Sequence, residues 1–159
     1  MNILISRMKT EEYPILRRFL YLSIFVPEGQ ALPPMDILDT PEFQVYLDKF
    51  GQEPDDIAVA VECDCKIVGA AWARVMDDFG HFYEDVPSLA ISLLPEYRGI
   101  GLGKRLLSGL LDQLRFAGHD RVTLSVQKEN HTACKLYLSL GFYPVHENDE
   151  EYIMLNTLI

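Results

Sequence analysis

A glycine-rich run near residue 100 combines the residue types that hold a phosphate group. Glycine allows backbone conformations with positive φ and lets the main chain approach a ligand closely. The first turn of a helix adds N–H groups without partners inside the helix, and phosphate binds well at such a place. An apolar stretch precedes the run and a helical pattern begins within it, which predicts an anion-binding turn. The run consists of Arg98, Gly99, Ile100, Gly101, Leu102, Gly103 and Lys104.

Two common phosphate-binding motifs do not fit this run. A P-loop needs glycine five residues before the Gly-Lys pair and Ser or Thr after it, whereas this chain has Arg98 and Arg105 at those positions. A dinucleotide fingerprint needs a third glycine where this chain has Lys104, and it lies in an opening βαβ unit, which is absent before this run. The basic side chains of the run suit charge-assisted hydrogen bonds to another kind of phosphate ligand.

A second group of polar residues lies about 30 positions further on, in a helical pattern that follows a strand pattern. Asn130 is a good helix N-cap. Tyr137 shares the apolar face of the same helix, and without further information we would assign it to the core.

Both segments resemble motifs of one enzyme family. Arg98, Gly101 and Gly103 form an Arg-x-x-Gly-x-Gly pattern similar to the acyl-CoA pyrophosphate loop of the GNAT family of N-acetyltransferases. Residues 130–142, NHTACKLYLSLGF, resemble the family's Asn-x-x-Ala-x-x-Leu-Tyr-x-x-x-Gly-Phe segment. The two motifs occur in the family's order and spacing, so the resemblance extends over residues 87–142.

The resemblance implies acetyl-CoA as cosubstrate, no metal, and a role for each matched residue. Backbone N–H groups from Gly99 to Lys104 would hold the pyrophosphate at the positive end of the helix. The pantetheine amides would pair with the strand edge at Ile91, Ser92 and Leu93, which is free in the family because this strand and the next splay apart. Tyr137 would protonate the departing sulfur, and Asn130 would contact the cofactor arm.

The group that would deprotonate an acceptor amine is not evident. An amine with a pKa of about 10.4 must lose a proton before attack, and many family members use a Glu on the central strand. Residues 87–94 contain no acid, and the N-terminal acetylases of the RimI type carry Glu where this chain has Ser125. We therefore expect a water molecule relayed by a serine, with loop residues as alternatives. The serines are Ser88, Ser92 and Ser125, and the loop residues are Glu84, Asp85, His81 and Glu28.

Composition narrows the functional class. With 159 residues and 48% apolar residues, the chain predicts one globular domain over residues 1–159. A net charge of −10 argues against nucleic-acid binding and suits a cationic acceptor, although a solvated acidic surface explains it equally simply. There is no signal-peptide pattern or membrane-length apolar run, so we expect a cytoplasmic protein without a membrane partner. The three cysteines, Cys63, Cys65 and Cys134, lack disulfide or zinc-site spacing.

Periodicity predicts an α/β sandwich with a mixed, mostly antiparallel sheet of six to seven strands and about four helices, as in the GNAT fold. Thr10 would cap the first helix and Gly118 would end the third. The expected strands are 3–5, 57–62, 66–75, 89–94, 122–126, 142–145 and 152–155, the expected helices are 10–20, 40–51, 102–114 and 133–140, and residues 77–83 are an expected loop.

The leading hypothesis is an acetyl-CoA-dependent N-acetyltransferase acting on a primary amine of a small molecule or protein, through direct attack in a ternary complex. A catalytically idle acyl-CoA sensor or interaction module is the alternative, suggested by the missing base. Transfer of a longer acyl group or transfer to an oxygen acceptor is a third hypothesis. The acceptor, the acyl length and the oligomeric state, homodimer included, are left open by the sequence. The loop from Leu22 to Pro34 and the segments around His81 and Glu147 would shape the acceptor pocket.

Overall fold

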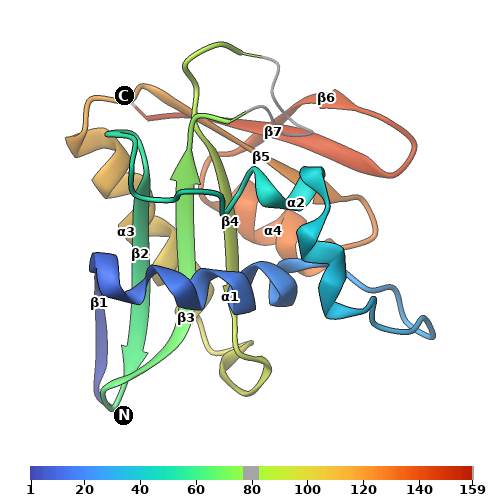
Figure 1. Ribbon diagram of the computed structural model, residues 1–159. Helices are drawn as coiled ribbons and strands as arrows, with labels where there is room; N and C mark the ends of the chain where they lie inside the picture. Colours follow the sequence, from blue (N-terminus) through green and yellow to red (C-terminus); the bar gives the residue numbers. More distant parts are fainter. Residues whose placement is uncertain (77–82, 159) are drawn as a thin grey trace.

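The computed structural model describes residues 1–76 and 83–158, and within them seven strands form one mixed sheet (Figure 1). The order across the sheet is β1-β2-β3-β4-β5-β7-β6, and every neighbouring pair is antiparallel except β4 and β5. The predicted mixed, mostly antiparallel sheet is confirmed. The strands are β1 Ile3–Arg7, β2 Ile57–Cys63, β3 Lys66–Arg74, β4 Ser88–Leu93, β5 Arg121–Gln127, β6 Tyr143–Glu147 and β7 Glu151–Thr157.

Helices cover both faces of the sheet, as Figure 1 shows for α1 in front of the strands and α3 behind them. The core side of α3 is a stripe of leucines spaced three and four residues apart, each burying a side chain worth about 1.5–3 kcal/mol. The stripe comprises Leu102, Leu106, Leu107, Leu110, Leu111 and Leu114. The α-helices are α1 Leu16–Ser23, α2 Pro41–Gln44, α3 Leu102–Phe116 and α4 His131–Ser139, with short 3₁₀ helices at Thr10–Ile15, Met35–Asp39 and Pro95–Tyr97.

The two parallel strands at the centre part soon after they meet. Their pairing within the described residues is at Ser88 and Thr123, where the backbone N–H of Thr123 also donates to the carbonyl of Pro87 at 2.9 Å. Further along, β4 continues to pair with β3 through Leu93, while its other edge faces the opening. This agrees with the expectation of a free edge on this strand. Polar backbone groups are therefore exposed at the middle of the sheet.

The first predicted helix is split by a change of geometry. Residues Thr10–Ile15 form a 3₁₀ helix before α1 begins at Leu16, and Pro14, which has no N–H to donate, lies within it. Lys9, not Thr10, is the N-cap, since its N–H donates to the Glu12 carboxylate at 2.8 Å. The prediction that Thr10 caps this helix is therefore wrong.

The second predicted helix starts as expected and ends early. Thr40 is its N-cap and Pro41 its first residue, but α2 ends at Gln44 and turns follow to Gly51. The reason is tertiary: buried side chains on β3 take carbonyls that a longer helix would use. Trp72 donates to the Tyr46 carbonyl, and Arg74 donates to those of Val45 and Asp48.

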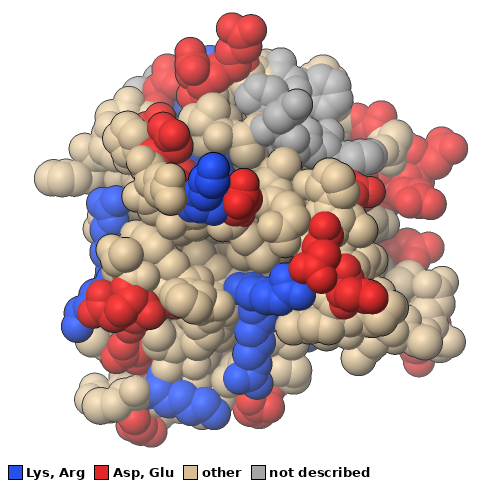
Figure 2. All heavy atoms as spheres, in the orientation of Figure 1, with Lys and Arg blue, Asp and Glu red and all other residues tan. Residues whose placement is uncertain are grey.

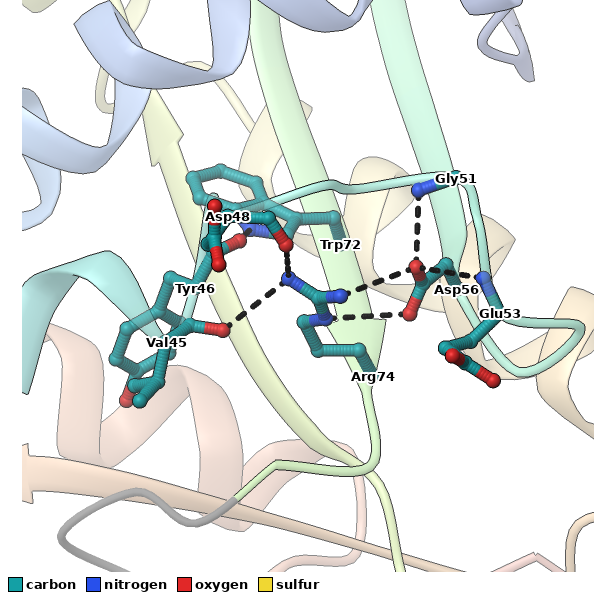
Figure 3. A network of polar contacts seen from close by, with 8 residues as sticks. All are labelled: Val45, Tyr46, Asp48, Gly51, Glu53, Asp56, Trp72 and Arg74. Carbon is teal, nitrogen blue, oxygen red and sulfur yellow. Dashed lines mark hydrogen bonds and ion pairs between the residues drawn. The ribbon is translucent and has the colours of Figure 1, made fainter.

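Arg74 is the centre of the polar network that fastens this segment to the sheet (Figure 3). Its Nε and Nη2 each lie 3.2 Å from a carboxylate oxygen of Asp56, and both side chains are buried. Asp56 also accepts from the backbone N–H groups of Gly51 and Glu53. A buried ion pair with these additional bonds fixes the geometry of residues 45–56.

On the face that Figure 2 shows, Asp and Glu side chains lie at separate places across the surface and do not form one continuous patch. This distribution is typical of a solvated surface. Among the described residues, no helix has the length and apolarity needed to cross a membrane.

Candidate active site

The glycine-rich run forms an open turn between β4 and α3. Gly99 and Gly101 have φ of +78° and +88°, a backbone region that disfavours other residues, and no atom lies within 4 Å of where a Cβ would stand on either. Gly101 is the N-cap of α3, so the first N–H groups of the helix face the same open space. Ile100, Lys104 and Arg105 are exposed beside it. The turn is thus an unobstructed cradle for an anion.

Arg98 fastens this turn to the rest of the site. Its Nε donates to the Leu93 carbonyl at 3.2 Å and its Nη2 to the Leu22 carbonyl, near the end of α1, at 3.3 Å. We expected this guanidinium to be available for the phosphate. Two of its five N–H donors are used by the protein backbone, and the side chain is exposed, so its remaining donors stay available to an anion beside the amide groups of the turn, Lys104 and Arg105.

A cavity of about 210 Å³ lies where β4 and β5 part. It brings together segments far apart in the sequence, including the end of α1, α2, α4 and the first residue of β7. Its lining is mostly apolar toward α1 and α2 and mixes polar with apolar side chains toward β5 and α4. The lining residues on β4 and β5 are Leu89, Ala90, Ile91, Leu124, Ser125, Val126 and Gln127. Of the expected pantetheine edge, Ile91 lines the cavity, while Leu93 is buried and next to the turn.

Tyr137 lines this cavity from α4 and is also part of the core. Its side chain is buried, its ring lies 5.8 Å from that of Phe142, and burial, together with the nearby Cys134, raises the pKa of its phenol above the ordinary value. The hydroxyl has no hydrogen-bond partner among the described residues. Tyr137 is therefore a protonated, unpartnered donor at the wall of a cavity.

Asn130 caps α4, as expected, by accepting the N–H of Ala133 through its side-chain oxygen at 3.3 Å. It lines the cavity at the same time, so its capping bond fixes a polar group there. Cys134, one turn along, contacts the carbonyl of Gln127, and burial raises the pKa of its thiol.

The serines expected to relay water are placed differently from one another. Ser125 lines the cavity. Ser92 donates to the carbonyl of Phe19 at 2.6 Å, and Ser88 shares a hydrogen bond of 2.8 Å with Thr123, so both hydroxyls are buried in structural bonds. The Ser92 bond ties β4 to α1, and the Ser88 bond ties β4 to β5 where the two strands pair.

The loop residues considered as alternative bases are not brought to the cavity. Glu28, Glu84 and Asp85 are exposed, and none of the three lines it. His81 lies outside the described residues. From the loop between Leu22 and Pro34, Ser23, Ile24 and Phe25 do line the cavity, as expected of an acceptor-side wall.

Glu151 is a lining residue that the sequence analysis missed. It lies just before the expected strand 152–155, but it is the first residue of β7 and pairs with Gln127 on β5. The side chain of Gln127 donates to Glu151 Oε1 at 2.8 Å, and burial, helped by the neighbouring Glu150, raises the pKa of the Glu151 carboxyl. No local signal marks it, because the apolar run that predicts this strand begins one residue later, at Tyr152.

In the described part of the chain, no group of three or more His, Cys, Asp or Glu side chains is arranged to hold a metal ion. The residues around the cavity combine an open glycine turn at a helix start, a free strand edge, a phenol and a carboxylate, which are groups that acyl transfer can use.

Comparison with known proteins identifies the family and the relatives that this chain is similar to. The model of the acetyltransferase (GNAT) family matches residues 23–142. A mycothiol acetyltransferase from Thermobifida fusca is 35% identical over 104 residues, which is 63% of this chain and 32% of that protein. The L-amino acid N-acyltransferase MnaT of Escherichia coli is 33% identical over 69 residues, 43% of this chain and 38% of that protein. The alignments thus span about a third of the length of these relatives.

Among solved structures, yncA of Salmonella typhimurium, solved with its cofactor acetyl-CoA, superposes with a TM-score of 0.68. The superposition covers 100% of this chain and 95% of the other at 18% identity. At this identity the likeness concerns the fold.

Proposed function

This chain belongs to the GNAT acetyltransferase family, and from that premise we propose that residues 1–159 form one acetyl-CoA-dependent N-acetyltransferase domain that acetylates a primary amine by direct attack in a ternary complex. The observation that carries the proposal is the junction of an open glycine cradle with a cavity between parted strands, lined by Tyr137. The acetyl-CoA bound by yncA supports the choice of cosubstrate.

The residues of the turn would bind the cosubstrate. Amide groups from Gly99 to Lys104, including that of Ile100 and those at the start of α3 from Leu102 and Gly103, would hold the pyrophosphate, with Lys104 adding its charge. Arg98 would act as a positioning residue by keeping the turn fixed to β4 and α1. The pyrophosphate would fit the turn because Gly99 and Gly101 leave its space open, and a side chain at either position would occupy that space.

The free edge of β4 would align the pantetheine arm. Backbone groups at Ile91, Ser92 and Leu93 can pair with its amides as a further strand would, and Asn130 can contact the arm from the opposite wall. A backbone N–H of this strand would then hold the thioester oxygen as negative charge develops on it.

Tyr137 would donate the proton that the departing thiolate needs. Its raised pKa keeps the phenol protonated at neutral pH, and the absence of a hydrogen-bond partner among the described residues leaves that proton available. The buried position of the phenol would limit the access of bulk water to the departing sulfur.

The test is to follow free thiol and acetylated product by mass spectrometry with acetyl-CoA and a panel of amines. We expect one N-acetylated amine for each CoA released. If coenzyme A raises the melting temperature but no amine provokes release, the chain is a binding module and the catalytic proposal is wrong.

A further inference from the structure

Glu151 stands out because it is a carboxylate without a counter-charge in a cavity. Among the described residues, no Lys, Arg or His nitrogen lies within ion-pairing distance of it, and Oε2 has no hydrogen-bond partner. Gln127 occupies only Oε1. Keeping a partly buried carboxylate ionised without a counter-ion costs free energy. Binding of a cation beside Glu151 would therefore be favourable.

The charge of the cavity wall limits what that cation can be. Among the described residues that line the cavity, Glu151 is the one acid, and no Lys, Arg or His contributes. One ammonium therefore finds a partner. A second ammonium, as in a polyamine, has no acidic partner among these lining residues. The carboxylate of a free amino acid has no cationic partner there and is repelled by Glu151.

The wall on the α1 and α2 side complements an apolar body. Trp72 and Arg74 hold the α2 segment in place through its carbonyls, so that wall is built into the fold (Figure 3). The end of the pantetheine arm would enter the same cavity of about 210 Å³, so the space left for the acceptor is small compared with the roughly 300–1,000 Å³ of sites for drug-sized ligands. The apolar lining residues on this side are Leu20, Ile24, Phe25, Phe43 and Tyr46.

We propose that Glu151 binds the ammonium of a small primary amine with one positive charge and an apolar body, and then removes a proton from it. The inference rests on the acetyltransferase function proposed above and supplies the base that the sequence analysis could not find. Gln127 acts as a positioning residue, because its bond to Oε1 holds the Glu151 carboxylate at the cavity wall that both residues line.

Atoms and charges balance in the resulting reaction. The ammonium transfers one proton to Oε2 of Glu151, and the neutral nitrogen then attacks the thioester carbon. The C–N bond forms and the C–S bond breaks, and Tyr137 gives its proton to the leaving sulfur. The nitrogen loses a second proton as the amide forms, which restores the phenol through the cavity water. Glu151 releases its proton to solvent, so the products are the amide, the free thiol and one proton.

The substrate class is tested by three acceptors with the same aromatic body and by the polyamine spermidine. Phenylethylamine and phenylalaninamide each carry one ammonium and no carboxylate, whereas phenylalanine adds a negative charge at the same position. We expect the first two to be acetylated with kcat/KM at least about tenfold above phenylalanine and spermidine, since one unmatched charge in a partly buried site costs at least that factor. Preference for phenylalanine, the substrate type named for the Escherichia coli relative, would overturn the substrate assignment.

The role of Glu151 is tested with Glu151→Gln, which keeps an oxygen to accept the Gln127 bond and removes only the charge. We expect kcat/KM to fall by roughly a hundredfold. By calorimetry on the CoA-bound protein, the Kd for phenylethylamine should rise about tenfold while the Kd for CoA is unchanged. Glu150→Gln is the matched control, because it removes an exposed charge one residue away, and it should keep the parental rate on the high-pH plateau.

The outcomes separate the two proposals. If the parent protein binds CoA and acetylates amines but Glu151→Gln does so equally well, Glu151 is not the base and this inference alone fails. If the parent does not bind CoA, the acetyltransferase proposal fails and the role of Glu151 fails with it. Glu150→Gln moves the acidic limb of kcat/KM to lower pH if Glu151 is the titrating base, because Glu150 raises the pKa of that carboxyl; an unmoved limb contradicts the assignment.

Discussion

Gln127 Nε2 donates a hydrogen bond of 2.8 Å to Glu151 Oε1 across the paired strands β5 and β7. This contact places a carboxylate in the cavity that also holds the phenol of Tyr137. In the proposed reaction Glu151 is the base and Tyr137 is the acid. The Glu151 side chain is partly buried and the Tyr137 side chain is buried.

The stability of Glu151→Gln should depend on pH in a defined direction. Burial raises the folded-state pKa of Glu151 above its unfolded value. Its contribution to stability is therefore fully present below the unfolded pKa and is lost as pH rises through the folded pKa. Relative to the parent, Glu151→Gln should become more stable as pH rises from acid to neutral. Urea unfolding of both proteins across this range checks the sign, and a difference that does not change with pH contradicts the burial of the charge.

Replacing Tyr137 by Phe should separate chemistry from binding. The hydroxyl makes no hydrogen bond to the described residues, so the free energy of unfolding and the Kd for CoA should hardly change. Loss of the proton donor should lower kcat by roughly a hundredfold or more. Stopped-flow thiol detection measures this, with Tyr143→Phe on exposed β6 as the control. Equal thiol release by Tyr137→Phe and the parent would remove the acid role.

Gly101→Ala and Gly118→Ala form a matched pair at the two ends of α3. Their φ values are +88° and +94°, and a Cβ meets no atom within 4 Å at either, so both substitutions cost a similar strain of about 1–3 kcal/mol. Only Gly101 lies in the anion cradle. Calorimetry should show the Kd for CoA at least about tenfold higher for Gly101→Ala and unchanged for Gly118→Ala. An equal effect of the two would mean that strain, not ligand approach, is responsible.

Asp56→Asn should destabilise the protein far more than Asp39→Asn. Asp56 is buried against Arg74, and removing its charge leaves a buried guanidinium uncompensated, at a cost of about 3–5 kcal/mol. Asp39 pairs with Arg17 on the surface, where such pairs contribute about 0–1 kcal/mol. Urea midpoints compare the two directly. A small loss for Asp56→Asn would show that residues 45–56 do not depend on the Arg74 network.

The anion cradle was predictable because its signal is local. Glycines with required positive φ, a helix start and basic neighbours lie within seven consecutive residues, and Gly99 and Gly101 have the expected conformation. The cap at Asn130 likewise follows from one helix start, whereas the expected role of Tyr137 comes from the family resemblance, because its helix face alone predicts a core residue.

The base and the shape of the acceptor wall could not be predicted from such signals. Glu151 faces Gln127 only because of the register between β5 and β7, strands separated in sequence by a helix and a further strand. α2 ends at Gln44 because Trp72 and Arg74, far along the chain, take the following carbonyls. Both features depend on tertiary hydrogen bonds, which local residue patterns do not encode.

The central claim is that this chain holds the diphosphate of a CoA thioester in the turn from Gly99 to Lys104. Isothermal titration of the folded protein with coenzyme A tests it most directly. We expect saturable binding of one CoA per chain that weakens at least about tenfold in Gly101→Ala and not in Gly118→Ala. No heat of binding to the folded parent, or binding that the Gly101 substitution leaves unchanged, would contradict the account.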